Sequence, residues 1–180
     1  MGASAEQLAQ LAHQLDQFDK PTTPRVILGA ALWYAEVGLH VFPLTPGAKT
    51  PLRGSRGCKE ATTDPARIVR WWRTTPAANL GIATGWLVDV IDIDGPPGVK
   101  SWAGMYERDL PPVLGTVSTP RAGGSHLYVA AVPGRGNAAA IKPGIDYRGR
   151  GGYVVAPPSL GPNGVAYRWR TPLQVSRLKQ

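Results

Sequence analysis

Apolar residues recur at helical spacing near the start of the chain, and strand-like runs predominate later. Residues 4–18 carry apolar side chains three and four positions apart, which predicts an amphipathic helix. Two further helices are expected over residues 25–36 and 65–73, because Pro24 and Pro65 suit a first helical turn and Asp64 suits an N-cap. A fourth helix is expected over residues 98–108.

Short runs rich in β-branched residues follow, separated by glycine and proline turns. They predict strands at residues 39–43, 81–84, 86–94, 113–117, 126–132, 153–156 and 167–170. The 22 glycines and 18 prolines of the 180 residues favour many turns over a helical bundle. Helices first and strands later predict an α+β (mixed α/β) fold, with an N-terminal helical appendage and linker over residues 1–24 and one domain over residues 25–180.

Charge changes this picture by suggesting a partner. The chain has 20 Lys and Arg against 12 Asp and Glu, a formal net charge of +8, which is typical of proteins that bind polyanions but also serves solubility. Basic segments at residues 49–73 and 142–179 flank an acidic stretch at residues 89–109. The basic flanks therefore favour a nucleic-acid or nucleotide partner.

The cysteine count and the hydropathy of the chain indicate its cellular compartment. Cys58 is the one cysteine, so an internal disulfide is excluded, and with three histidines no zinc site is expected. The first 20 residues lack the apolar core of a signal peptide, and the longest apolar run, residues 26–35, is too short to span a bilayer. We expect a cytoplasmic protein with no membrane partner.

Asp92 and Asp94 form the most informative motif. Side chains alternate along a strand, so both carboxylates leave the same face, about 6.6 Å apart. That spacing allows both to bind one hard cation or a pair of cations, although two solvated carboxylates at a strand end give the same pattern. Asp89 is out of phase with them, so it is expected on the opposite face, solvated or paired.

Two other segments hold candidate chemistry. Gly123 and Gly124 precede Ser125 and His126, so the backbone there can approach a ligand and the imidazole can donate to a phosphate or a sugar hydroxyl, or be structural. Asp146 lies beside Arg148 and Arg150 among four glycines, which is typical of a phosphate or metal site and also of a basic hairpin with a compensating acid.

These motifs occur in a specific order along the chain. In one-letter code they are ALWYAEVGLHVFPL at 31–44, KTP at 49–51, ATTDP at 61–65, WW at 71–72, NLGIATG at 79–85, DID at 92–94, GGSHLY at 123–128, GIDYRG at 144–149 and GYVVAPPS at 152–159. Together they resemble the bifunctional DNA primase/polymerase (Prim-Pol) domain of the archaeo-eukaryotic primase superfamily. The resemblance covers most of the chain.

The resemblance implies an N-terminal α/β unit packed on an RRM-like catalytic sheet. It also implies that Asp92, Asp94 and Asp146 bind two divalent metals, Mg²⁺ or Mn²⁺, and that His126 contacts the incoming nucleotide. Further candidates for nucleotide, phosphate or template contacts are Ser125, Arg148, Lys49 and Arg150. The zinc-binding insertion of some relatives is excluded by the single cysteine.

The function expected from this resemblance is template-directed, two-metal nucleotidyl transfer from NTP or dNTP, to start or extend a strand on single-stranded DNA in replication. The partners implied are a single-stranded DNA template, a primer strand, the nucleotide, and a helicase domain or protein. The residues leave two alternatives open: a metal-dependent nuclease, and a non-catalytic RRM-like nucleic-acid-binding module using Trp and Tyr as stacking platforms.

Overall fold

The computed structural model describes residues 22–105 and 110–178, which fold into two antiparallel sheets and three α-helices. The helices are α2 (Pro24–Glu36), α3 (Pro65–Thr74) and α4 (Gly95–Ala103). The strands are β1 (Val41–Leu44), β2 (Asn79–Ala83), β3 (Val88–Ile93), β4 (Gly115–Ser118), β5 (Ser125–Ala130), β6 (Ala138–Lys142), β7 (Ile145–Arg148), β8 (Tyr153–Val155) and β9 (Arg168–Thr171). The expected α+β fold is confirmed.

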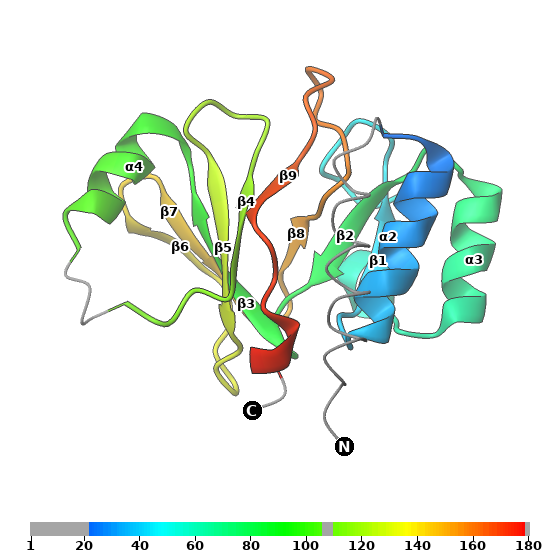
Figure 1. Ribbon diagram of the computed structural model, residues 1–180, viewed down its shortest axis with the longest axis horizontal. Coiled ribbons are helices and arrows are strands. Elements are labelled where there is room, and N and C mark those ends of the chain that lie inside the picture. The colour runs from blue at the N-terminus through cyan, green and yellow to red at the C-terminus, as the bar shows by residue number, and fades with distance from the viewer. Residues whose placement is uncertain (1–21, 106–109, 179–180) are drawn as a thin grey trace.

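The larger sheet has the strand order β6-β7-β3-β5-β4-β9 (Figure 1). Because side chains alternate along each strand, its central strand β3 presents Ile91 and Ile93 to one face and Val88, Val90 and Asp92 to the other. The first face packs under α4 in a small apolar core. The second face contributes to the main core and also carries the polar residues of interest.

The smaller sheet, β1-β2-β8, carries α2 and α3 (Figure 1). The Thr23 and Asp64 side chains accept hydrogen bonds from Val26 N and Ala66 N, so they cap these two helices. The main apolar core joins both sheets and includes Phe42, Leu80, Val90 and Tyr128. Strand β8 comes from late in the chain, so the expected N-terminal unit is completed by C-terminal residues.

Several sequence expectations need adjustment. The fourth helix begins at Gly95 rather than residue 98, and residues 106–109 within its expected end lie outside the described residues. Strand β3 begins at Val88, so Trp86 lies in the turn before it. Strands β6 and β7 were not among the predicted strands, although a basic hairpin was one of the two interpretations of the segment around Asp146. Their hairpin has no run of buried apolar residues to signal it, because β6 is mostly exposed.

The proposed N-terminal appendage cannot be compared with the structure, because the helix expected over residues 4–18 lies outside the described residues. The boundary near residue 24 therefore stays a prediction. Within residues 22–105 and 110–178, no helix has the length and apolar character needed to cross a membrane.

Candidate active site

Asp146, Asp92 and His126 form a row across three neighbouring strands. Asp92 on β3 pairs in register with Asp146 on β7 and with His126 on β5. Residues that pair across antiparallel strands project from the same face of the sheet. The sheet register therefore brings together residues that are far apart in the sequence, on the face opposite α4.

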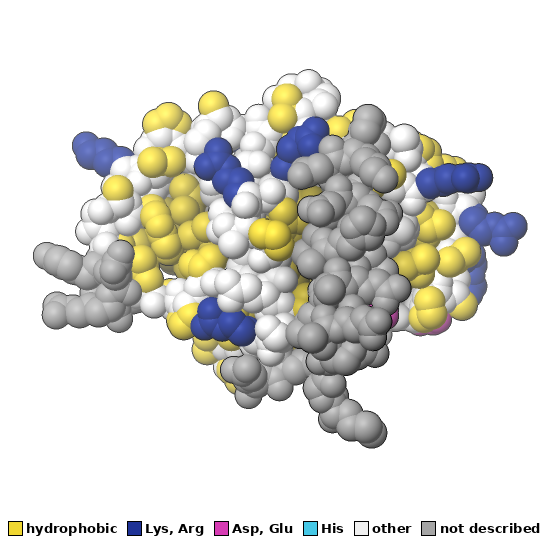
Figure 2. Space-filling view, in the orientation of Figure 1, with side chains coloured by type: hydrophobic (Ala, Val, Ile, Leu, Met, Phe, Trp, Pro, Cys, Tyr) yellow, Lys and Arg dark blue, Asp and Glu magenta, His cyan; other side chains and the backbone are white. Residues whose placement is uncertain are grey.

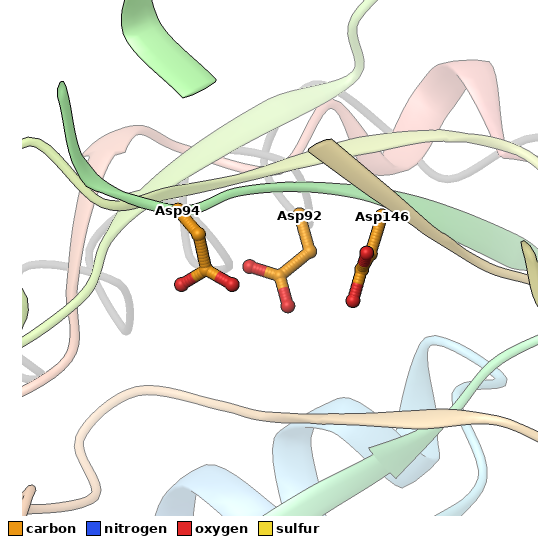
Figure 3. Close-up of side chains that lie close together, drawn as sticks. All are labelled: Asp92, Asp94 and Asp146. Carbon is orange, nitrogen blue, oxygen red and sulfur yellow. The ribbon is translucent and has the colours of Figure 1, made fainter. Parts of the chain in front are cut away.

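Asp94 completes a cluster of three carboxylates just beyond the end of β3. One oxygen from each of Asp92, Asp94 and Asp146 lies within 4.8 Å of the others. Figure 3 shows all three carboxylates pointing to the same side of the sheet. Three convergent carboxylates are oxygen ligands of the kind that hard divalent cations prefer, so these residues fit a metal site.

Burial gives Asp92 a distinctive electrostatic setting. Its pKa is raised above the usual value because burial and the neighbouring Asp94 disfavour its charge, and Arg148 and Lys49 oppose that rise. A bound cation would compensate both unfavourable effects. The setting of Asp92 therefore supports the metal interpretation more strongly than carboxylate spacing alone.

Two arginines hold the carboxylates in place. Arg148 donates to Asp146 Oδ2 at 2.7 Å and to Asp92 Oδ2 at 3.4 Å. Arg121 donates to Asp94 Oδ1 at 3.0 Å. Asp94 occupies the N-cap position of α4, but its side chain makes no capping hydrogen bond there. Its carboxylate points to Arg121 and the cluster instead.

His126 is almost fully buried, with 5% of its surface exposed. Burial lowers its pKa to about 3, and the positive charges of Lys49 and Arg148 act in the same direction. Its Nε2 lies 3.6 Å from Asp92 Oδ1, and its ring lies 5.7 Å from the Tyr167 ring. The imidazole is therefore neutral at pH 7 and held against the carboxylate row.

A cavity of about 270 Å³ opens beside the carboxylates. Asp92, Asp94, His126 and Arg148 line it from the large sheet. Other lining residues come from segments that the sequence separates widely: Lys49, Asn137, Gly151, Gly152, Tyr153 and Tyr167. The Tyr153 hydroxyl donates to the Lys49 carbonyl at 3.1 Å, which fixes the backbone that carries this lysine.

The structure separates the remaining sequence candidates. Lys49 and Arg148 line the cavity beside the carboxylates, as does His126. Ser125 is one residue out of phase with His126, so strand alternation places its side chain on the opposite face. Arg150 lines a neighbouring cavity, next to Trp86. Asp89 is buried on the α4 face and paired, not solvated.

Three residues around the carboxylates were missed by the sequence analysis. Arg121, Asn137 and Tyr167 lie in segments without a recognisable motif, and only the folded chain brings them to the site. The net positive charge of the sequence does not indicate which residues lie at the site. On the face in Figure 2, Lys and Arg side chains are spread apart rather than gathered into one patch.

A comparison with protein-family models identifies the family of this chain. No curated protein matches the chain. The family model described as "Bifunctional DNA primase/polymerase, N-terminal" matches residues 31–179, a span that contains the carboxylate cluster, His126 and every residue lining the cavity. By this match over most of its length, the chain belongs to the Prim-Pol family of bifunctional DNA primase/polymerase N-terminal domains.

Proposed function

We propose that this domain catalyses template-directed transfer of a nucleotide to the 3′-hydroxyl of a strand on single-stranded DNA. Family membership implies DNA primase/polymerase activity of the nucleotidyltransferase type, with DNA and nucleotides as substrates. The observation that supports the finer proposal is the carboxylate cluster of Asp92, Asp94 and Asp146. Two of its members, Asp92 and Asp94, line a cavity together with Lys49 and Arg148.

Asp92, Asp94 and Asp146 are the residues that would hold divalent cations, Mg²⁺ or Mn²⁺. Such ions lower the pKa of the attacking hydroxyl and neutralise the triphosphate and the leaving pyrophosphate. Without a cation, these carboxylates would repel the phosphates of a nucleic acid. A non-catalytic binding surface therefore does not explain why the three carboxylates lie together.

The protein's own part is to position the substrates. Lys49 and Arg148 supply positive charge at the cavity wall, where they suit the phosphates of an incoming nucleotide. Because His126 is neutral, it can make a polar contact to the nucleotide without adding charge next to the cations. Arg148 and Arg121 also orient the carboxylates before any cation binds, which reduces reorganisation during the reaction.

The direct test is extension of a labelled primer on a single-stranded template, with Mg²⁺ or Mn²⁺ and either NTPs or dNTPs. We expect metal-dependent lengthening that Asp92→Asn abolishes. The matched control is Asp64→Asn, because Asp64 caps α3 on the surface and asparagine also caps well. Omitting the primer tests whether the domain starts chains or only extends them.

Other outcomes would identify other functions. Shortening of the labelled strand would indicate a metal-dependent nuclease. Binding without metal or turnover would indicate a nucleic-acid-binding module. The expected helicase partner finds no support in the described residues or in the family match.

A further inference from the structure

Trp86 presents a large aromatic surface outside the catalytic cavity. It lies in the turn between β2 and β3, and 62% of its surface is exposed, the largest fraction among the exposed large hydrophobic residues within 22–105 and 110–178. The His40 ring stacks behind it, with centroids 5.0 Å apart and an interplanar angle of 24°. The indole is therefore supported on one face, at a place where solvation alone would favour a polar side chain.

Two basic side chains share a cavity with this indole. Trp86, Arg150 and Lys59 line a cavity of about 290 Å³, and no Asp or Glu is among the described residues that line it. The Arg150 guanidinium carbon lies 5.8 Å from the centre of the Trp86 ring. Proteins that bind single-stranded nucleic acid combine exposed aromatic rings, on which bases stack, with cationic side chains that contact the phosphates. Trp86 with its two neighbouring cations has this combination.

This second cavity adjoins the catalytic cavity. Gly151 and Gly152 line both of them. Along the same segment, Arg148 points to the carboxylates and Arg150, two residues later, lies beside Trp86. A strand that leaves the carboxylates across these glycines reaches Trp86 next.

The connection between the two cavities is held firmly. The Thr84 hydroxyl donates to the Gly149 carbonyl at 2.7 Å, and Thr84 N donates to the Gly152 carbonyl at 3.0 Å. Gly85 has a φ of +85°, and a Cβ there would lie 2.1 Å from Arg150 Cα. Glycine at this position thus allows the Trp86 turn to pack directly on the backbone of Arg150.

We propose that Trp86, with Arg150 and Lys59, binds the single-stranded DNA template next to the catalytic cavity by stacking one base on the indole. This inference rests on the proposed function, because it extends the path of the same template. Stacking tolerates any base, which suits a strand that must move through the site regardless of sequence.

The test measures binding rather than synthesis, so it is independent of catalysis. Binding of a labelled oligothymidylate is followed by fluorescence anisotropy in chelator, with both the full chain and its Asp92→Asn variant. We expect Trp86→Ala to raise the Kd about 5- to 150-fold, the range found for loss of one stacked base, and Trp86→Phe to retain most of the affinity. Arg150→Ala should weaken binding and lower the salt slope by about 0.7.

The controls separate stacking from general effects. Val165→Ala alters another exposed apolar residue, and Arg25→Ala removes an exposed charge on α2; both should bind like the wild type. On an oligonucleotide made only of abasic residues, Trp86→Ala and wild type should bind alike, because there is no base to stack. A Trp86-dependent difference on the abasic strand would overturn the stacking proposal.

Failure of this inference is distinguishable from failure of the proposed function. If the Trp86→Ala variant binds oligothymidylate within about twofold of wild type while primer extension proceeds, the proposed surface is wrong and the polymerase stands. If Trp86-dependent binding is present but no synthesis occurs, the surface stands and the catalytic proposal fails. Circular dichroism of each variant checks that it is folded.

Discussion

Asp92 and Asp146 lie directly opposite each other on the antiparallel strands β3 and β7, and Arg148 donates a hydrogen bond to both. Two carboxylates in cross-strand register repel each other, so the arrangement costs stability unless cations compensate it. Arg148 supplies one positive charge, and Asp94 adds a third negative charge nearby. The three carboxylates together therefore favour binding of further positive charge.

Divalent cations should stabilise the wild-type protein and not the Asp92→Asn variant. At a concentration about 100 times the Kd, binding adds roughly 2–3 kcal/mol to the free energy of unfolding. In chelator the variant should be at least as stable as wild type, because the environment of Asp92 raises its pKa and so disfavours its charge. Thermal unfolding with and without Mn²⁺ measures both effects. Equal stabilisation of the two proteins would contradict the assignment of Asp92.

Removing the Lys49 side chain should weaken nucleotide binding. Lys49 lines the catalytic cavity and also a separate cavity of about 300 Å³, away from Trp86, that Arg121 and Tyr167 line as well. A charge-assisted contact to phosphate contributes about 1.5–3 kcal/mol, so Lys49→Ala should raise the KM for the nucleotide about tenfold or more. Steady-state primer extension measures this. Lys142→Ala on the exposed strand β6 is the matched control and should leave KM unchanged.

Two buried tyrosines on opposite faces of the large sheet should respond differently to loss of the hydroxyl. Tyr147 donates to the buried carboxylate of Asp89, so Tyr147→Phe should cost about 1–3 kcal/mol. The hydroxyl of Tyr128 has no hydrogen-bond partner among the described residues, so Tyr128→Phe should be neutral or stabilising. Urea unfolding in chelator compares them. A larger loss at Tyr128 than at Tyr147 would contradict this account.

Ionisation of Tyr34 should make the free energy of unfolding depend on pH in the alkaline range. Its buried hydroxyl donates to the Pro157 carbonyl and accepts from Trp169 Nε1, which links α2 to the segment after β8 and to β9. Burial raises the pKa of Tyr34 well above 10.0. A raised pKa in the folded state gives stability that is present below pH 10 and is lost as pH rises, because the unfolded chain ionises first.

Tyr34→Phe should cost about 1–3 kcal/mol at pH 7 by leaving the Pro157 carbonyl unpaired. Because phenylalanine does not ionise, the difference between variant and wild type should shrink above pH 10. Urea unfolding over this pH range measures it. A difference that grows with pH would show that the hydroxyl is not held in its neutral form.

The sequence determined the features that depend on local physics. Cap residues such as Asp64, followed by Pro65, placed α3 within one residue of its observed end. Strand alternation predicted that Asp92 and Asp94 share one face and that Asp89 leaves the other. The ordered motifs predicted the family, and the family match confirms it.

Tertiary structure alone decided how distant segments meet. Strand β6, which pairs with the strand that carries Asp146, is mostly exposed and so has no buried apolar pattern to reveal the hairpin. No local rule places Asp146 opposite Asp92, because cross-strand register depends on packing of the whole sheet. The same is true of Arg121, Tyr167 and the position of Trp86 beside Arg150. Sequence motifs identified the three carboxylates, whereas long-range packing brought together the residues that surround them.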